Sequence, residues 1–221
     1  MPAIESELQA LRENLHDMLS MVKSQLEKCI TAIEKKNGSI AKEILNDEKK
    51  INIQELAIDR DCENILALHT PVATDLRLVL ATLKITNDLE RIGDSAKSLG
   101  KILSRDLSKN EYNWIAELNI ARMLEVLVYM LKEMGTSLRK ENPKSALKAV
   151  KKDDELNYYF KQSIKTTAAL IEKHPDDAKT ILKLFLLVRT LERAGDLTKN
   201  IAEEIVFQLE ARVLKHKGLQ A

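Results

Sequence analysis

Apolar residues recur along the whole chain with the period of an α-helix, without the alternation of a β-strand. Near the N-terminus they form one stripe: Leu8, Leu11, Leu15, Met18, Leu19, Val22, Leu26, Ile30 and Ile33. This stripe predicts a long first helix, which we expect Gly38 to cap before Ser39 starts the next helix. Only six Gly and four Pro interrupt the 221 residues, so the helices are expected to be long.

The helical pattern breaks at similar places in the two halves of the chain. We expect a second helix from about Ser39 to Leu68 and, after Pro71, a third helix capped by Thr74 that runs to about Leu103. The later helices are predicted over about residues 109–139, 143–172 and 176–215. Pro71 and Pro175 occupy matching breaks. The sequence therefore predicts an all-α fold, a tandem repeat of two three-helix bundles with a pseudo-twofold relationship, with repeats at residues 1–106 and 107–221.

A hexamer occurs once in each half, as LERIGD at residues 89–94 and as LERAGD at residues 191–196. Each copy places a Glu and an Asp four residues apart, with Gly93 or Gly195 directly before the Asp. A Gly inside a helix costs about 1 kcal/mol relative to Ala. Because this cost recurs at the same place, we expect close backbone approach or ligand access there.

The predicted second helix carries a polar stripe bordered by apolar residues. Glu48, Asn52, Glu55 and Asp59 follow the spacing i, i+4, i+7 and i+11, which places them on one narrow face. Core-type residues flank this stripe on both sides. Carboxylates in such surroundings need a cation or a neighbouring Arg or Lys.

Distances along the chain bring these acids next to the hexamers. Glu48 and Asp94 are each 23 residues from Pro71, and Asn52 and Glu90 are each 19 residues away, so the pairs should lie at equal heights in an antiparallel hairpin. The second repeat offers the matching set Asp153, Asn157, Glu192 and Asp196 around Pro175.

Oxygen-rich sets of this kind suit hard or borderline cations such as Mg, Mn or Fe, and sometimes Zn. The predicted metal ligands are Glu48, Asn52, Glu55, Asp59, Glu90, Asp94, Asp153, Asn157, Glu192 and Asp196. Two other interpretations stay open at this point. Arg91 and Arg193 could neutralise the acids instead, or the motifs could simply decorate solvated helix faces.

Composition excludes several classes of function. The net charge of +1 gives no electrostatic reason to expect nucleic-acid binding. No apolar run is long enough to span a bilayer, and no signal peptide is evident. Cys29 and Cys62 have no metal or redox spacing and are expected to be free, mostly buried thiols in a reducing cytoplasm. The four His share no spacing, and no nucleophile or phosphate-loop motif is present, so no catalytic apparatus is expected.

Residues 71–99, PVATDLRLVLATLKITNDLERIGDSAKSL, resemble the signature of the PhoU-type phosphate-signalling regulators. Residues 187–207 resemble a second copy of that signature, and residues 48–62 resemble the family's second helix. The resemblance covers essentially the whole chain. It departs from the family pattern in the second repeat, where Phe160 and Ile164 replace the equivalents of Glu55 and Asp59, and in the first repeat, where Ser98 replaces an Asn.

The resemblance implies a cytoplasmic, non-enzymatic negative regulator of phosphate uptake and phosphate-starvation signalling. Its implied partners are a phosphate-specific ABC transporter and a sensor histidine kinase, so it would lie at the membrane only through them. The resemblance also implies a homodimer and a multinuclear metal, Fe, Zn, Mn or Mg, held by Glu90–Asp94 and Glu192–Asp196. The rival hypotheses are a helical scaffold, with or without bound metal, and a metal-dependent phosphatase or oxidase.

Overall fold

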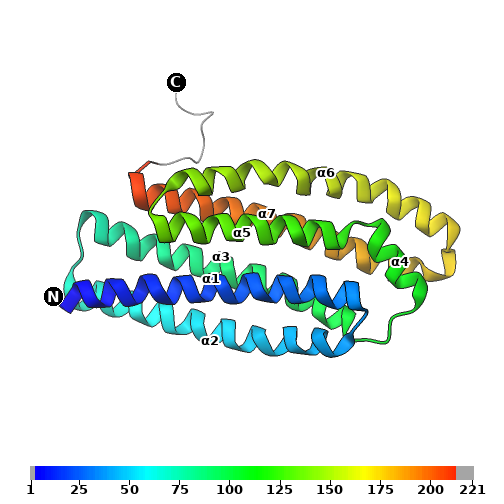
Figure 1. Ribbon diagram of the computed structural model, residues 1–221, viewed down its shortest axis with the longest axis horizontal. Coiled ribbons are helices and arrows are strands. Elements are labelled where there is room, and N and C mark those ends of the chain that lie inside the picture. Colours follow the sequence, from blue (N-terminus) through cyan, green and yellow to red (C-terminus); the bar gives the residue numbers. More distant parts are fainter. Residues whose placement is uncertain (1–2, 213–221) are drawn as a thin grey trace, which may run out of the picture.

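The computed structural model describes residues 3–212, and this part of the chain is helical with short connections and no β-strand. The long helices form two layers, α1–α3 and α5–α7 (Figure 1). The helices are α1 (Ala3–Lys35), α2 (Gly38–His69), α3 (Ala73–Leu103), α4 (Lys109–Glu117), α5 (Ile120–Lys140), α6 (Pro143–Lys173) and α7 (Ala178–Glu210), with a 3-10 turn at Pro175–Asp177. The predicted all-α fold with two three-helix bundles is confirmed.

The two bundles share one core. Equivalent helices pack against each other across the layers, α1 against α5 and α3 against α7. The buried apolar residues of both layers form a single continuous cluster. The helices that carry the hexamers, α3 and α7, therefore lie at the centre of the molecule, and each also packs against the second helix of its own bundle, α2 or α6.

The single helix predicted over residues 109–139 is wrong. Helix α4 ends at Glu117, and Asn119 adopts a left-handed backbone conformation with φ 56° before α5 begins at Ile120. Asn tolerates this conformation better than most residues with a side chain. In a continuous helix, the side chains of Leu118 and Ile120 would point to different sides. The break allows both side chains to be buried in the core.

The cap predicted at Gly38 is also wrong. Helix α1 ends at Lys35, and Lys36 takes the left-handed conformation with φ 50° that was expected of the glycine. Gly38 is instead the first residue of α2. The side chain of Asn37 caps α2 by accepting a hydrogen bond of 2.9 Å from the backbone N–H of Ser39.

Two further boundaries differ from the prediction. Thr74 does not cap α3, because the helix starts two residues earlier than expected, at Ala73, and Val72 occupies the N-cap position without a side-chain hydrogen bond. The last helix begins at Ala178, after the 3-10 turn, and ends at Glu210. The predicted end at Lys215 lies outside the described residues.

Both cysteines are free and buried, as predicted. Burial raises the pKa of the Cys29 thiol strongly, and burial followed by nearby carboxylates raises the pKa of Cys62 to about 12. Both thiols therefore stay protonated and unreactive at neutral pH. Within residues 3–212, no helix is long and apolar enough to cross a membrane.

Candidate metal centre

Three carboxylates from α2 and α3 converge at the first hexamer. Glu48 of α2 and Glu90 and Asp94 of α3 each offer an oxygen atom, and these atoms lie within 4.8 Å of one another. We call this set the first acidic cluster. Glu48 is only 2% exposed, whereas Asp94 reaches solvent. The oxygens of Glu48 and Asp94 lie within 4.8 Å of each other, which confirms that these two residues lie at the same height.

Lys97 provides the counter-charge of this cluster. Its Nζ atom lies 3.3 Å from Glu48 Oε1 and 3.0 Å from Asp94 Oδ1. Arg91 was the candidate for this role from the sequence, but its Nη1 atom lies 3.5 Å from Asp88 Oδ1. The neutralising side chain is therefore the Lys three residues after the motif Asp, on the same side of α3.

The pKa values in the cluster show that one ammonium group does not balance three carboxylates. Burial, and next the hydrogen bond with Asp94, raises the pKa of Glu48. Burial and the charge of Asp94 raise the pKa of Glu90. Burial alone would raise the pKa of Asp94, but hydrogen bonds from Lys97 and Glu48 lower it. A partly buried, predominantly acidic set of this kind favours a proton or an additional cation.

The other predicted ligands of α2 lie beside the cluster. The side chain of Asn52 lies against Glu48, and in the amide orientation that satisfies both of its polar atoms its nitrogen donates to Glu48, at 3.0 Å to Oε1 and 3.1 Å to the backbone oxygen. The pKa of Glu55 is raised by burial and, next, by the charge of Asp59, followed by the charges of Glu48 and Asp94. Because it senses the charges of Glu48 and Asp94, Glu55 borders the cluster. Asp59 lies further along α2 and is not part of the converging set.

Gly93 allows a side chain from α1 to approach the cluster. A Cβ atom on Gly93 would lie 3.3 Å from Gln25 Oε1 and 3.4 Å from Glu48 Oε2. Gln25 is fully buried; its Nε2 donates to the backbone oxygen of Ile44 at 3.1 Å, but its Oε1 has no hydrogen-bond partner among the described residues. Its Nε2 also donates to Glu48 Oε2 at 3.5 Å, so a buried amide of α1 lies next to the carboxylates, which the sequence patterns did not reveal.

The second hexamer forms a related arrangement on α6 and α7. Lys199 Nζ lies 2.9 Å from Asp153 Oδ2 and 2.7 Å from Asp196 Oδ1, and Asn157 donates to Asp153 at 2.9 Å. Burial and the charges of Asp196 and Asp153 raise the pKa of Glu192. We call Asp153, Glu192 and Asp196 the second acidic cluster. Its Lys is again three residues after the motif Asp; Arg193 forms no ion pair within residues 3–212.

Close approach of side chains from α6 explains the second glycine. A Cβ atom on Gly195 would lie 2.4 Å from Leu156 Cδ1 and 2.7 Å from Asp153 Oδ1, which is closer than atoms can pack. The expectation that the hexamer glycines permit close approach is therefore confirmed on α7, and in a milder form on α3.

The two clusters differ in how well they fit a metal ion. Within residues 3–212, the first cluster is the one group in which three or more potential ligand side chains converge closely. Its oxygen donors, together with the unpartnered Oε1 of Gln25, fit a hard cation. Both clusters have a bridging Lys, but among the described residues the carboxylates of the second cluster do not converge as those of the first do, and Phe160, which stacks on Phe185 at 6.0 Å, replaces an acid. The second set as arranged does not fit a metal ion.

Comparison with known proteins identifies the family. The PhoU domain matches residues 15–103 and 120–205. The chain is 29% identical over 206 residues to the phosphate-specific transport system accessory protein PhoU homolog of Deinococcus radiodurans, covering 92% of this chain and 94% of that protein. It is 26% identical over 213 residues to the phosphate-specific transport system accessory protein PhoU of Edwardsiella tarda, covering 96% of this chain and 87% of that protein.

Solved structures agree with the sequence comparison. The crystal structure of PhoU from Pseudomonas aeruginosa superposes with a TM-score of 0.85 at 25% identity, over 94% of this chain and 99% of that one. The names of these relatives describe accessory proteins, which agrees with the expectation of a protein that is not an enzyme. Because the domain matches most of both repeats, the chain belongs to the PhoU family.

Proposed function

We propose that this protein is a cytoplasmic negative regulator of phosphate uptake and phosphate-starvation signalling, which acts by contact with a phosphate-specific ABC transporter and a sensor histidine kinase. The observation that carries this proposal is the match to accessory proteins of the phosphate-specific transport system over nearly the whole chain. We further propose that residues 1–106 and 107–221 are the units of the duplication and that the protein forms a homodimer.

Exposed apolar side chains favour a function based on protein contact. Large apolar residues are exposed on the helices that carry the acids: Ile53 (68%), Leu56 (65%), Tyr158 (58%) and Leu186 (57%). Exposed apolar residues point to a protein interaction surface where they form a contiguous patch with a polar rim. They support a regulator that binds other proteins over a rival enzyme.

Deletion of the gene tests the regulatory role. Without this protein, transcription of phosphate-starvation genes should stay high at high external phosphate, and phosphate uptake should no longer be restrained. Reintroduction of the wild-type gene should restore repression. Unchanged repression in the deletion strain would contradict the proposal.

We propose that the first acidic cluster binds a divalent cation, Mn, Fe, Zn or Mg, through Glu48, Glu90 and Asp94, with Asn52, Glu55 and Asp59 nearby. The cation would neutralise the carboxylates and hold α2 against α3. Lys97 would leave the cluster when the metal binds. In the second cluster, Asp153, Asn157, Glu192 and Asp196 were predicted ligands, but we propose that Lys199 serves there as the permanent cation, so the repeats are unequal.

Elemental analysis after loading with each metal, followed by removal of free ions, tests this difference. We expect metal in the wild type and in Glu192→Gln/Asp196→Asn, and none in Glu90→Gln/Asp94→Asn. Equal loss in both double variants would contradict unequal repeats, and metal-free wild type would favour the plain scaffold. Turnover of a phosphate ester by the loaded wild type, lost in Glu90→Gln/Asp94→Asn, would instead support the rival phosphatase.

A further inference from the structure

A polar groove runs between α1 and α5 and shares no residue with the two acidic clusters. It consists of two adjoining cavities of about 590 and 330 Å³, which have His16, Arg139 and Lys140 in common. We call it the α1–α5 groove. It lies where the two repeats meet, and Gln208 of α7 also lines its larger cavity.

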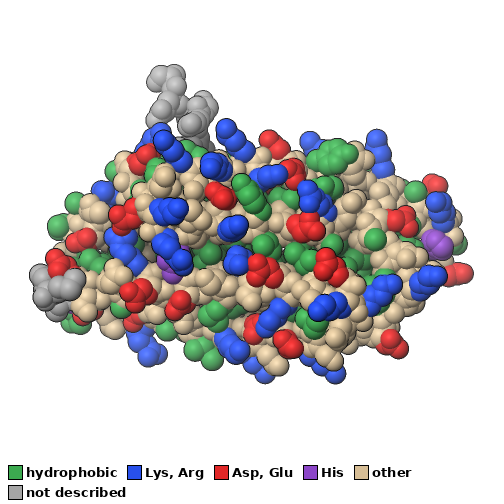
Figure 2. Space-filling view, in the orientation of Figure 1, with side chains coloured by type: hydrophobic (Ala, Val, Ile, Leu, Met, Phe, Trp, Pro, Cys, Tyr) green, Lys and Arg blue, Asp and Glu red, His purple; other side chains and the backbone are tan. Residues whose placement is uncertain are grey.

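The smaller cavity is strongly basic. Lys23, Lys132, Arg139 and Lys140 line it together with His16, and no Asp or Glu does. Lys23 pairs with Glu27 at 2.9 Å, but the other three cations form no ion pair within residues 3–212. Figure 2 shows Lys and Arg side chains along the seam between α1 and α5, with Asp and Glu side chains among them. Unpaired cations around one cavity attract an anion with more than one negative charge.

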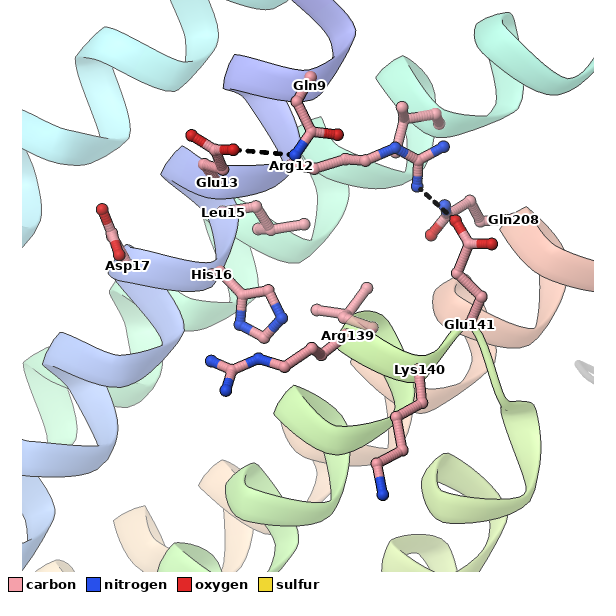
Figure 3. A pocket seen from close by; sticks show the side chains of 12 residues that line it. Gln9, Arg12, Glu13, Leu15, His16, Asp17, Arg139, Lys140, Glu141 and Gln208 are labelled. Carbon is pink, nitrogen blue, oxygen red and sulfur yellow. Dashed lines mark hydrogen bonds and ion pairs between the residues drawn. The ribbon is translucent and has the colours of Figure 1, made fainter.

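The larger cavity has a mixed lining. Arg12 of α1 lies 3.4 Å from Glu141 at the end of α5, and Glu13 accepts a hydrogen bond of 2.8 Å from Gln9 (Figure 3). Asp17 also lines this cavity. These carboxylates would repel a second anionic group, so a ligand that fits the whole groove carries its negative charge at one end only.

Two residues that line the larger cavity, Gln208 and His16, each have one polar atom, Oε1 and Nε2, that is closed to solvent and has no hydrogen-bond partner within the described residues, so a ligand reaches these atoms only when the side chains turn toward the cavity. Gln208 is only 4% exposed. A buried unsatisfied acceptor typically costs about 1–3 kcal/mol. Such a cost is expected where a ligand supplies the missing partner. Since Oε1 can only accept, that ligand must present an N–H or O–H group to it.

The titration of His16 agrees with this picture. Burial lowers the pKa of His16, and the positive charge of Arg139 lowers it further, against the opposing charge of Asp17. An anion bound beside His16 and Arg139 would reverse this effect and favour the imidazolium form.

We propose that the α1–α5 groove binds a small phosphate monoester, with its phosphoryl group among Lys132, Arg139 and Lys140 and its hydroxyl or amino groups toward Gln208. The basic cavity selects the multiply charged phosphoryl group over a single carboxylate. The acidic side chains of the larger cavity exclude polyphosphates and nucleic acids. This site does not depend on the proposed regulatory role, because binding is a property of the isolated protein.

Isothermal titration calorimetry of the full chain with AMP, glucose 6-phosphate and inorganic phosphate tests the proposal. At least one ester should bind saturably and more tightly than inorganic phosphate. Lys132→Gln/Arg139→Gln should weaken that binding by about tenfold or more, since charged hydrogen bonds contribute about 1.5–3 kcal/mol. Gln208→Met should remove the preference for the ester and leave inorganic phosphate binding unchanged.

Lys161→Gln/Lys165→Gln is the matched control, because it removes two charges from the exposed face of α6 and should bind like the wild type. Equal weakening by this control would reveal diffuse attraction and overturn the site. Equal affinity for ester and inorganic phosphate, or no saturable binding at millimolar concentration, would overturn it as well. NMR titration of His16 separates binding from folding defects: its pKa should rise with the bound ester in the wild type and in the control.

Discussion

The Oδ1 atom of Asp153 on α6 lies 2.7 Å from the point where a Cβ atom on Gly195 of α7 would stand. The buried carboxylate therefore occupies space that exists only because the motif residue has no side chain. The same relationship is looser in the first repeat, where the corresponding distance from Gly93 to Glu48 Oε2 is 3.4 Å.

Substitution of the two glycines should therefore have unequal effects. Gly195→Ala should lower the free energy of unfolding by about 1–3 kcal/mol, because Leu156 and Asp153 must shift in a packed core. Gly93→Ala should change it by less than about 1 kcal/mol, since the better helix propensity of Ala offsets mild crowding. Urea denaturation measures both values, and equal losses would contradict this difference.

Removal of the ammonium group of Lys97 should destabilise the metal-free protein. Lys97→Met leaves Glu48 and Asp94 without their cation, and we expect a loss of about 1–2 kcal/mol, discounted because Lys97 is partly exposed. If the first acidic cluster binds metal, added Mn²⁺ should recover more stability in this variant than in the wild type. Thermal unfolding with chelator and with Mn²⁺ gives both values. Lys165→Gln serves as the control.

The pH dependence of stability should reveal the raised pKa of Glu48. A carboxyl group with a higher pKa in the folded than in the unfolded state binds its proton more readily when folded, so its contribution is most favourable at low pH and is lost as pH rises through the folded pKa. In chelator, Glu48→Gln should thus be more stable than wild type at neutral pH, with the gain disappearing as the pH falls below the pKa of Glu48. A pH-independent difference would contradict this origin.

The break between α4 and α5 should depend on residue 119. Asn119→Gly should be close to neutral, because Gly adopts the left-handed conformation without steric cost. Asn119→Val should cost about 1–2 kcal/mol, because a side chain branched at Cβ is disfavoured there. Circular dichroism melts of both variants test the assignment, and a stabilised Val variant would indicate a continuous helix instead.

Gln208→Met should stabilise the protein in the absence of ligand. The substitution keeps the length of the side chain but removes a buried acceptor without a partner, and we expect a gain of up to about 1–2 kcal/mol. A variant that is more stable yet discriminates less between ligands would show that the wild type retains Gln208 for binding. A loss of stability would show that the amide has a structural role.

The fold and the first acidic cluster could be predicted because both follow from helix geometry. The apolar period defines the helices, and equal distances from Pro71 place Glu48 beside Asp94. The role of Lys97 and Lys199 as counter-charges could also have been predicted from the sequence, because each Lys follows the motif Asp by three residues, about one helical turn. Arg91 and Arg193 directly follow the motif Glu in the sequence, but adjacent helix residues point to different sides, so neither is the counter-charge of its cluster.

Other features could not be read from local patterns. Gln25 approaches Glu48 from α1, and only the packing of three helices brings them together. The break at Asn119 depends on the burial of Leu118 and Ile120. That burial is decided by tertiary packing and not by local helix propensity. The α1–α5 groove joins residues of both repeats, so no periodicity within one repeat could indicate it.

The pairing of α1 with α5 and of α3 with α7 has a consequence for the origin of the chain. Each helix meets its own counterpart, which is the self-complementary arrangement of a twofold-symmetric dimer. A half-length ancestor would have left the faces of its first and third helices uncovered unless a second copy bound to them. Gene fusion would then have joined two subunits already in contact, and afterwards each half was free to lose or keep its own ligands.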